Sequence, residues 1–519
     1  MALIRRLAPR AIPMLSRPPS TTSCIGTMSF LQTLTTFATP QPQTTKYVKV
    51  LHRPSGFNEA VQSMQYAVRG QLVLRAQELS RQLDAGAELP FSSVIYCNIG
   101  NPQSVGQTPI TFIRQCVAAV TCPSLLDTSA LPSDVISRAR EFLEDSHGVG
   151  AYSESKGVYS IRKRIAEAIA RRDGYPSNPD TVYLSNGASE AVKALLQITI
   201  RNSQDGVMTP IPQYPLYSAS LTALSGRQVG YYLDEQNDWS LNIHELQRSL
   251  DNARVEGTQV RAIVVINPGN PTGQVLSREN MEDIIRFCER ENLVLMADEV
   301  YQKNIYTKEK PFISFKKVLR DLNSPVELAS FHSVSKGVMG ECGLRGGYVE
   351  LVNTERDVEE LLYKVMSVSL CSNLVGQFAM DLMMTPPKEG EPSYELYKTE
   401  TDGIFNDLKS KAAMLCDSLN TLAGVTCNKS EGAMYLFPRI ALPEKAMIEA
   451  KKRGYACADV LYCMELLDAT GICVVPGSGF GQKEGTLHFR TTFLPPKEAI
   501  DDVMKRLRKF HEQFLLSYS

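Results

Sequence analysis

The fold of this chain is best read from residues 331–351, FHSVSKGVMGECGLRGGYVEL. An apolar run from Leu328 to Val334 predicts a buried strand, and Lys336 follows it among small residues. Because burial disfavours the ammonium form, we expect the pKa of Lys336 to be lowered and its free amine to be available. A free amine at a strand end is what a Schiff base with an aldehyde requires.

The residues around Lys336 also have the chemistry of a phosphate site. Two hydroxyls, Ser333 and Ser335, precede the lysine, and Arg345 follows it in a glycine-rich turn. An amine and a phosphate site at one strand end predict pyridoxal 5′-phosphate as a cofactor, because it offers both an aldehyde and a phosphate. Similar short patterns arise by chance around surface lysines. The prediction therefore also requires residues elsewhere in the chain that could bind the pyridine ring and the substrate.

Strands and helices alternate through the middle of the chain. Short apolar runs at 181–184, 207–209, 262–266 and 293–297 are separated by amphipathic helical segments. This pattern predicts an α/β fold with a mostly parallel sheet flanked by helices. Polar clusters follow these strands at their carboxyl ends, where such sheets bind ligands. Beyond residue 372, long helices and short strands predict a smaller α+β domain.

The length of 519 residues exceeds what one hydrophobic core normally supports, so we expect more than one domain. We predict a transit peptide and linker at 1–58 and an N-terminal segment of the small domain at 59–124. The large cofactor-binding domain is expected at 125–372, and the C-terminal part of the small domain at 373–519.

The composition is that of a soluble globular enzyme. Hydrophobic residues make up 43% of the chain, charged residues make up 21%, and the net charge is −1. A charge this small gives no field that would recruit nucleic acid or a membrane, and no apolar run is long enough to span a bilayer. The 12 cysteines show no CxxC pair and no zinc-ligand spacing, so we expect free thiols and no metal site.

The N-terminus has the composition of an organelle transit peptide. Glu59 is the first acidic residue, and four arginines in the first 17 residues alternate with apolar side chains before a Ser/Thr-rich stretch. We therefore expect import into the mitochondrial matrix. A second start at Met28 would skip the signal and give a cytoplasmic form, and a disordered basic tail would have a similar composition.

Asp298, directly after the run 293–297, is the candidate partner for a pyridine nitrogen. A carboxylate there would keep the ring nitrogen protonated and let the ring act as an electron sink. Tyr301 and Asn270 would hydrogen-bond the phenolate oxygen of the same ring. Simpler explanations exist: a helix cap or ion pair for Asp298, a half-buried aromatic for Tyr301, and turn formation for Asn270.

Further positions fit the same cofactor and its substrate. Ala188 and Ser189 open a predicted helix whose backbone amides would bind a phosphate, although an ordinary N-cap explains them too. Tyr214 lies between prolines and would stack on the pyridine ring. Arg490, within a strand, would bind a substrate carboxylate through two parallel hydrogen bonds, unless it pairs with a distant acid.

These motifs occur in an order that resembles one family. From about residue 59 to 519 the chain resembles the class I aminotransferases of fold type I, through NPGNPTG at 267–273, ADEVY at 297–301, SVSK at 333–336, GLRGG at 343–347 and a late FR at 489–490. Within that family it is similar to the alanine aminotransferases, through YCNIGNPQ at 96–103, PIPQYPLYSA at 210–219 and EGAMYLFP at 431–438.

The resemblance implies a role for each candidate residue. Lys336 would bind the cofactor aldehyde and move a proton between the substrate Cα and the cofactor carbon C4′. The pyridine ring would be held, in the roles given above, by Asp298, Asn270, Tyr301 and Tyr214. The phosphate would be held by Ala188, Ser189, Ser333, Ser335 and Arg345, and the substrate by Gly100, Asn270 and Arg490.

One departure from the family leaves a choice open. Lys336 and Arg345 are separated by one residue more than the commoner class I spacing, which looks like an alanine aminotransferase feature. Either Ser333 or Ser335 would therefore touch the phosphate. Tyr152 would reach the phosphate of a neighbouring subunit, so the resemblance also implies a homodimer with shared active sites.

The implied reaction transfers an amino group between L-alanine and 2-oxoglutarate, giving pyruvate and L-glutamate by a ping-pong mechanism through pyridoxamine phosphate. The alternative is a glutamate:glyoxylate aminotransferase of the same subfamily, which we expect in peroxisomes. The chain ends in LLSYS rather than an SKL-like tripeptide, which favours the alanine enzyme. No sequence motif identifies what binds the distal carboxylate of glutamate.

Overall fold

The computed structural model describes residues 56–66 and 70–519. The fold described below is that of the unit Phe57–Ser519. The expected transit peptide and linker, with the alternative start at Met28, lie outside the described residues apart from the last three linker positions.

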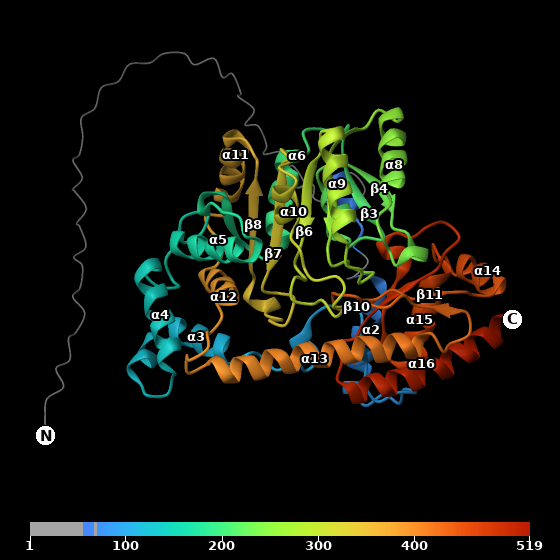
Figure 1. The fold of residues 1–519 in the computed structure, drawn as a ribbon. Coiled ribbons are helices and arrows are strands. Elements are labelled where there is room, and N and C mark those ends of the chain that lie inside the picture. The colour runs from blue at the N-terminus through green and yellow to red at the C-terminus, as the bar shows by residue number, and fades with distance from the viewer. Residues whose placement is uncertain (1–55, 67–69) are drawn as a thin grey trace, which may run out of the picture. The chain divides into compact units, whose positions relative to one another are not determined.

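A seven-stranded sheet forms the centre of this unit (Figure 1). In spatial order, its strands are β2 (Val182–Asn186), β8 (Gly346–Val352), β7 (Leu328–Ser333), β6 (Val294–Asp298), β5 (Gln259–Ile266), β3 (Asp205–Ile211) and β4 (Arg227–Tyr232). β8 runs against both of its neighbours, and the other strands are parallel to one another. The predicted α/β fold with a mostly parallel sheet is confirmed.

Burial on both faces explains why the central strands are continuously apolar. In β5, Ile263 and Val265 pack into one core, while Val264 and Ile266 point the other way and pack into a second. The first core is closed by α8 (Ile243–Val255), α9 (Arg278–Glu291) and α10 (Phe315–Asp321), and the second by α6 (Ala188–Thr199), α7 (Leu216–Ala223) and α11 (Arg356–Ser367). Helices therefore lie on both faces of the sheet (Figure 1).

A third core lies beside β2 and β8. It is built by α3 (Thr111–Thr121), α4 (Ser133–Ser146), α5 (Tyr159–Asp173) and α12 (Leu374–Met384). α5 ends at Gly174, which takes a φ of 77° and whose amide caps the helix. Ser277 caps α9 by accepting a hydrogen bond from the Asn280 amide.

β4 is a strand that the sequence analysis does not identify. It lies at the edge of the sheet and begins with two exposed residues, Arg227 and Gln228. An edge strand needs an apolar side chain only at every second position, so β4 lacks the continuous apolar run that reveals β5 and β6.

The remaining elements share a separate core and form an α+β group. Its helices are α2 (Gln71–Asp84), α14 (Glu444–Lys452), α15 (Ala458–Thr470) and α16 (Lys497–Tyr518). Its short strands pair as β1 (Ile95–Tyr96) with β12 (Ile472–Cys473), β9 (Val425–Thr426) with β11 (Arg439–Ile440), and β14 (Phe489–Thr492) with both β10 (Tyr435–Leu436) and β13 (Val475–Pro476). The short helix α1 (Glu59–Ser63) buries no residue and contacts α7 instead.

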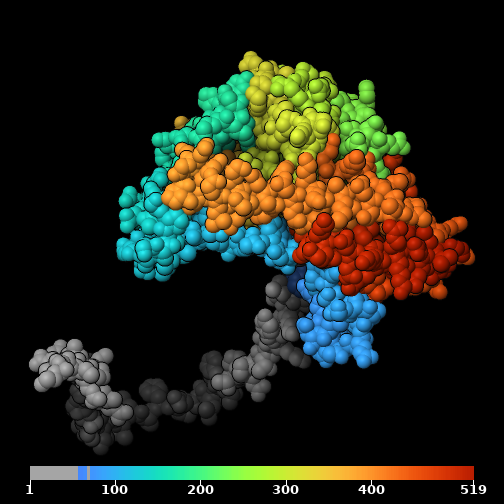
Figure 2. Space-filling view, turned by 60° about the horizontal axis from the view of Figure 1, so that its bottom comes forward, coloured from blue at the N-terminus to red at the C-terminus, as the bar shows by residue number. Residues whose placement is uncertain are grey.

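The long helix α13 (Tyr394–Leu419) connects the two groups of elements. It contacts α3 at one end and α16 at the other, and Figure 2 shows it crossing the surface between them. The smaller α+β domain is therefore present as predicted, while the residue boundaries of the domains remain a prediction. In the part of the chain that the structure describes, no helix combines the length and the apolarity needed to cross a membrane.

Candidate active site

Lys336 lies three residues beyond β7, in the turn that leads toward β8. Its amine donates a hydrogen bond to the carbonyl oxygen of Gly100 at 3.3 Å and lies 6.0 Å from the ring centre of Tyr301. Gly100 follows β1, so the N-terminal part of the described chain meets the end of the central sheet at this lysine.

The expectation that the pKa of Lys336 is lowered is wrong. Burial acts to lower it, but neighbouring negative charge outweighs burial and raises the pKa above its ordinary value. The charge interactions that raise it come from the side chains of Tyr435, Tyr214 and Cys342. Burial in turn acts to raise the pKa of Tyr435, but the cations of Lys336 and Arg490 lower it overall. The sequence argument considered burial alone, whereas the tertiary fold brings acidic side chains to the lysine.

Asp298, the last residue of β6, has one carboxylate oxygen in use and one free. Oδ2 accepts a hydrogen bond of 2.8 Å from the Tyr217 hydroxyl, whereas the buried Oδ1 has no partner. Burial raises the pKa of Asp298, although the hydrogen bonds from Tyr217 and the Val300 amide oppose the rise. A buried carboxylate oxygen without a donor fits a ring nitrogen that carries a proton.

The turn between β2 and α6 forms a cradle for an anion. Gly187, at a φ of 79°, leads into α6, whose first amides receive no side-chain cap. A Cβ at Gly187 would overlap the guanidinium of Arg345, so glycine allows the arginine to lie across the helix N-terminus. Arg345 donates to Ser335 Oγ at 3.3 Å and to the Asn186 carbonyl at 3.0 Å. Helix amides, a hydroxyl and a cation together suit a phosphate.

The structure distinguishes the two serines that precede Lys336. Ser335 contacts Arg345, whereas Ser333 Oγ accepts a hydrogen bond of 2.9 Å from the Ser335 amide. Ser335 therefore lies in the cradle with the helix start at Ala188, and Ser333 supports the turn behind it.

Arg490, on β14, is a buried cation whose hydrogen bonds go to neutral groups. Its Nη atoms donate to Asn270 Oδ1, at 3.1 Å, and to the Asn98 carbonyl, and its buried Nε has no partner. The guanidinium lies 4.3 Å from the ring centre of Tyr435 and 4.6 Å from that of Phe480. A buried guanidinium without a carboxylate partner suits the carboxylate of a substrate.

Tyr435 links this arginine to the lysine. Its ring lies against Arg490, and its hydroxyl accepts a hydrogen bond of 3.3 Å from Tyr301. A Cβ at Gly100 would overlap the same hydroxyl, so Gly100 cannot carry a side chain unless Tyr435 moves. Since the Gly100 carbonyl accepts from Lys336, a continuous set of contacts runs from the guanidinium to the amine.

The two remaining predicted tyrosines lie in different surroundings. Tyr214 is partly buried, and its hydroxyl is hydrogen-bonded to that of Tyr66 at 2.8 Å. Tyr214 is one of the side chains whose charge interactions raise the pKa of Lys336, so it lies near the site. Tyr152 is 79% exposed, and the structure does not bring it to the site of its own chain.

Sequence reasoning misses three side chains of the site: Tyr217, Tyr435 and Cys342. Tyr217 is on the first turn of α7, three residues after Tyr214, which precedes the helix. Tyr435 lies in the motif EGAMYLFP, which indicates the family but not a role for the tyrosine. The local sequence around each gives no sign that it reaches Asp298 or Lys336, because those contacts form only in the folded chain.

Comparison with known proteins decides the family. The family model described as aminotransferase class I and II matches residues 123–507. This chain belongs to the class I and II aminotransferases. A probable mitochondrial alanine aminotransferase of Dictyostelium discoideum is 51% identical, over 91% of this chain and 92% of the relative. Alanine aminotransferase 2 of Panicum miliaceum is 51% identical, over 89% and 98%. Glutamate–glyoxylate aminotransferase 2 of Arabidopsis thaliana is 49% identical, over 89% and 96%.

Solved structures agree with this assignment. An alanine aminotransferase from Pyrococcus furiosus superimposes with a TM-score of 0.70 at 26% identity, over 88% of this chain and all of that one. An aminotransferase from Escherichia coli gives a TM-score of 0.70 at 25% identity, over 89% and 99%. The protein is therefore an aminotransferase of fold type I.

Aminotransferases of this family depend on pyridoxal phosphate, and the site fits that cofactor. The buried Asp298 Oδ1 has no hydrogen-bond donor in the protein and can accept one from the ring nitrogen of the cofactor. The Gly187 turn, Ser335 and Arg345 form a phosphate cradle next to the turn that carries Lys336. Each part of the cofactor thus has a chemically matched group in this chain.

Proposed function

We propose that this aminotransferase uses pyridoxal phosphate to exchange an amino group between L-alanine and 2-oxoglutarate. The proposal rests on the continuous contacts from Arg490 through Tyr435 and Gly100 to Lys336. These contacts bring a cation that can bind a carboxylate close to a reactive amine. One amino acid carries an α-carboxylate and an α-amino group equally close together, so it can engage both. The relatives named alanine aminotransferases, at 51% identity, support alanine as the substrate.

The cofactor would be held by side chains of four strand ends. Asp298 Oδ1 would accept from the ring nitrogen, Asn270 and Tyr301 would contact the phenolate, and Tyr214 would stack on the ring. The phosphate would be bound by Ser335, Arg345 and the amides of Ala188 and Ser189, with Ser333 supporting the turn. When bound, this cofactor supplies the electron sink that makes the Cα proton of an amino acid acidic.

The protein groups would position the substrate and move its proton. Arg490 would bind the α-carboxylate, and the rings of Tyr435 and Phe480 would exclude water from that ion pair. Because Asn270 Oδ1 already accepts from Arg490, its amide Nδ2 remains the end that can donate. Lys336 Nζ would move a proton from the substrate Cα to the cofactor carbon C4′ in the first half-reaction, and from C4′ to the Cα of the second substrate in the reverse half-reaction.

A half-reaction on purified protein loaded with pyridoxal phosphate tests the proposal. L-Alanine, L-glutamate, L-aspartate and glycine are added separately, and the absorbance of the lysine-linked cofactor and the formation of pyruvate are followed. Rapid conversion by alanine and glutamate, with little response to aspartate, is expected. A protein that binds the cofactor but leaves alanine unchanged would overturn the substrate.

The alternative is a glutamate:glyoxylate aminotransferase. It is favoured by the relatives of that name in Arabidopsis thaliana, at 49% identity over 96% of their length. Glyoxylate and 2-oxoglutarate are compared as amino acceptors after the first half-reaction. Faster amino transfer to glyoxylate, with glycine as product, would replace the first assignment.

We further propose a homodimer that shares its active sites and resides in the mitochondrial matrix. The exposed Tyr152 supports the shared site, and relatives named mitochondrial in Dictyostelium discoideum and Arabidopsis thaliana support the location. A start at Met28 would give the cytoplasmic alternative. Sedimentation of the purified protein tests the dimer. Import of the full chain into isolated mitochondria, beside a chain that starts at Met28, tests the location.

A further inference from the structure

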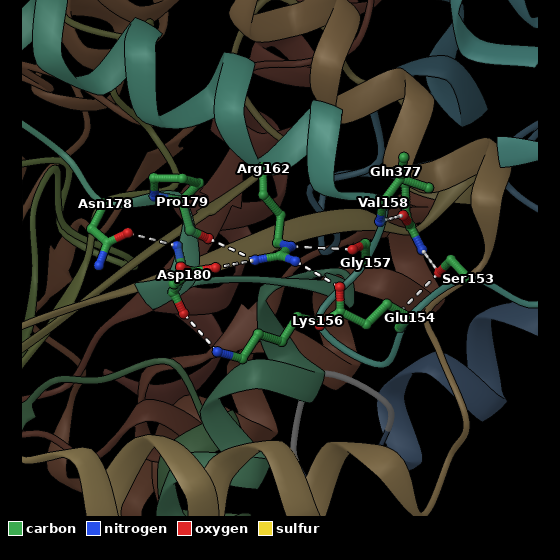
Figure 3. Close-up of polar contacts among 10 residues, drawn as sticks. All are labelled: Ser153, Glu154, Lys156, Gly157, Val158, Arg162, Asn178, Pro179, Asp180 and Gln377. Carbon is green, nitrogen blue, oxygen red and sulfur yellow. Dashed lines mark hydrogen bonds and ion pairs between the residues drawn. The ribbon is translucent and has the colours of Figure 1, made fainter. Parts of the chain in front are cut away.

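The segment Ser153–Val158, which directly follows the exposed Tyr152, is held by buried side chains from two helices (Figure 3). The first is Arg162 of α5, which is 2% exposed. It donates to the Gly157 carbonyl at 3.1 Å and to the Glu154 carboxylate at 2.7 Å. The guanidinium thus holds the segment at two points.

The second anchor is Gln377 of α12, which is also 2% exposed. Its Oε1 accepts a hydrogen bond of 2.9 Å from the Val158 amide, and its Nε2 donates to Ser153 Oγ at 3.0 Å and to the Ser372 carbonyl at 2.9 Å. Figure 3 shows Arg162 and Gln377 reaching this segment from separate helices. Both ends of the segment are therefore fixed.

The backbone of the segment is also tied to the central sheet. The Lys156 carbonyl accepts a hydrogen bond of 2.8 Å from the Leu184 amide of β2. Gly157, at a φ of 98°, packs so closely on Leu184 that a Cβ there would overlap its side chain. Surface loops are usually the mobile parts of a fold, but this one presents Tyr152 from a rigid base.

The same end of α12 touches the phosphate cradle through a different residue. Asn373 lies one turn before Gln377. Its backbone N–H and its side-chain Nδ2 both donate hydrogen bonds of 2.9 Å to Asn186 Oδ1. Its side chain also donates to the Arg345 carbonyl at 3.3 Å. Asn373 therefore supports the cradle of its own chain, whereas Gln377 supports the segment that presents Tyr152.

We propose that Gln377 and Arg162 are positioning residues that hold Tyr152 in the orientation in which it reaches the cofactor phosphate of the second subunit. This inference rests on the proposed homodimer with shared sites. A subunit that lacks the Gln377 contacts would then bind the cofactor normally in its own site and weaken binding in the site of its partner.

Mixed dimers with two affinity tags test this. One subunit carries Lys336→Ala, so the absorbance of the lysine-linked cofactor reports only the site of the other subunit. Gln377→Leu is placed either in the Lys336→Ala subunit or in its partner, and the affinity for pyridoxal phosphate is titrated at equilibrium. We expect about tenfold weaker binding in the first arrangement, because two hydrogen bonds of the segment are lost, and less than twofold in the second.

Asn373→Ala is the matched control on the same helix end. It is expected to give the opposite pattern, weaker binding when it lies in the subunit whose site is observed. Equal weakening from Gln377→Leu in either subunit would show a general structural role and overturn the inference. If Gln377→Leu does not fold, Ser153→Ala and Glu154→Ala remove one contact each from the exposed side, with an expected twofold to fourfold effect in the first arrangement.

Tyr152→Phe separates this inference from the proposed function. If Tyr152→Phe in the Lys336→Ala subunit leaves the affinity of the observed site unchanged, the shared site itself is refuted, and the positioning role with it. If Tyr152→Phe weakens binding while Gln377→Leu does not, the shared site stands and only the positioning role is overturned.

Discussion

Replacing Tyr217 with phenylalanine removes one hydrogen bond from the centre of the site and little else. The Tyr217 hydroxyl is buried and donates to Asp298 Oδ2 at 2.8 Å, and the phenyl ring would fill the same space. In the variant, Asp298 Oδ2 loses this side-chain donor. The other oxygen, Oδ1, is buried and has no partner in the protein to compensate for the loss. We expect the Tyr217→Phe protein to fold normally and to bind pyridoxal phosphate more weakly.

The size of the effect follows from the charge of the acceptor. A hydrogen bond to a charged buried group contributes about 1.5 to 3 kcal/mol, which corresponds to about 10- to 100-fold in affinity. Burial already raises the pKa of Asp298, and the bond from Tyr217 opposes that rise. Without this bond the pKa rises further. Because the carboxylate is ionised only above its pKa, the loss is expected to be largest at low pH.

Equilibrium titration with pyridoxal phosphate at a series of pH values measures both the loss of affinity and its dependence on pH. The matched control is Tyr231→Phe, which removes an equally buried hydroxyl that donates to the Val264 carbonyl at 2.8 Å. The role of this hydroxyl would be refuted if Tyr217→Phe bound pyridoxal phosphate as tightly as the wild type and Tyr231→Phe do, and if its affinity fell at low pH by the same amount as theirs.

Other substitutions probe the substrate end and the core. Gly100→Ala should raise the KM for alanine at least about tenfold, measured by initial rates, because the added Cβ displaces Tyr435; an unchanged KM contradicts this. Arg490→Lys should lower kcat/KM by about 10²-fold or more, since an ammonium cannot make the paired hydrogen bonds, while cofactor affinity stays constant. Lys316→Ala removes the cation that pairs with the buried Glu350, so it should lower the free energy of unfolding in urea by about 3 to 5 kcal/mol. A loss below about 1 kcal/mol would show that this buried ion pair does not stabilise the fold.

The parts of the site that the sequence predicts correctly are those that obey local rules. Asp298 and Lys336 are found because each follows a short apolar run, and such a run becomes a buried strand wherever it lies in an α/β sheet. Arg345 is found because it lies in a glycine-rich turn, and Ala188 and Ser189 are found because they open a predicted helix. β4 escapes because an edge strand does not need a continuous apolar run.

The error over the pKa of Lys336 has a different origin. Burial can be anticipated from the apolar run before the lysine, and burial does act in the expected direction. The opposing charge comes from Tyr435 and Tyr214, which lie far away in the sequence and in other elements of the fold. Electrostatic effects depend on distance in space, so a local sequence pattern predicts only part of them.

The sequence by itself determined the order of the strands and helices apart from β4, the α/β class, and which residues would lie at the carboxyl ends of the strands. These follow from hydrophobic periodicity and turn chemistry, which act over a few neighbouring residues. Only the tertiary structure decided that Ser335 rather than Ser333 meets Arg345, that Tyr217 holds Asp298, and that Gly100 must be glycine because Tyr435 fills the space beside it. Such contacts join distant segments, and they exist only once the packing of the hydrophobic cores has brought those segments together.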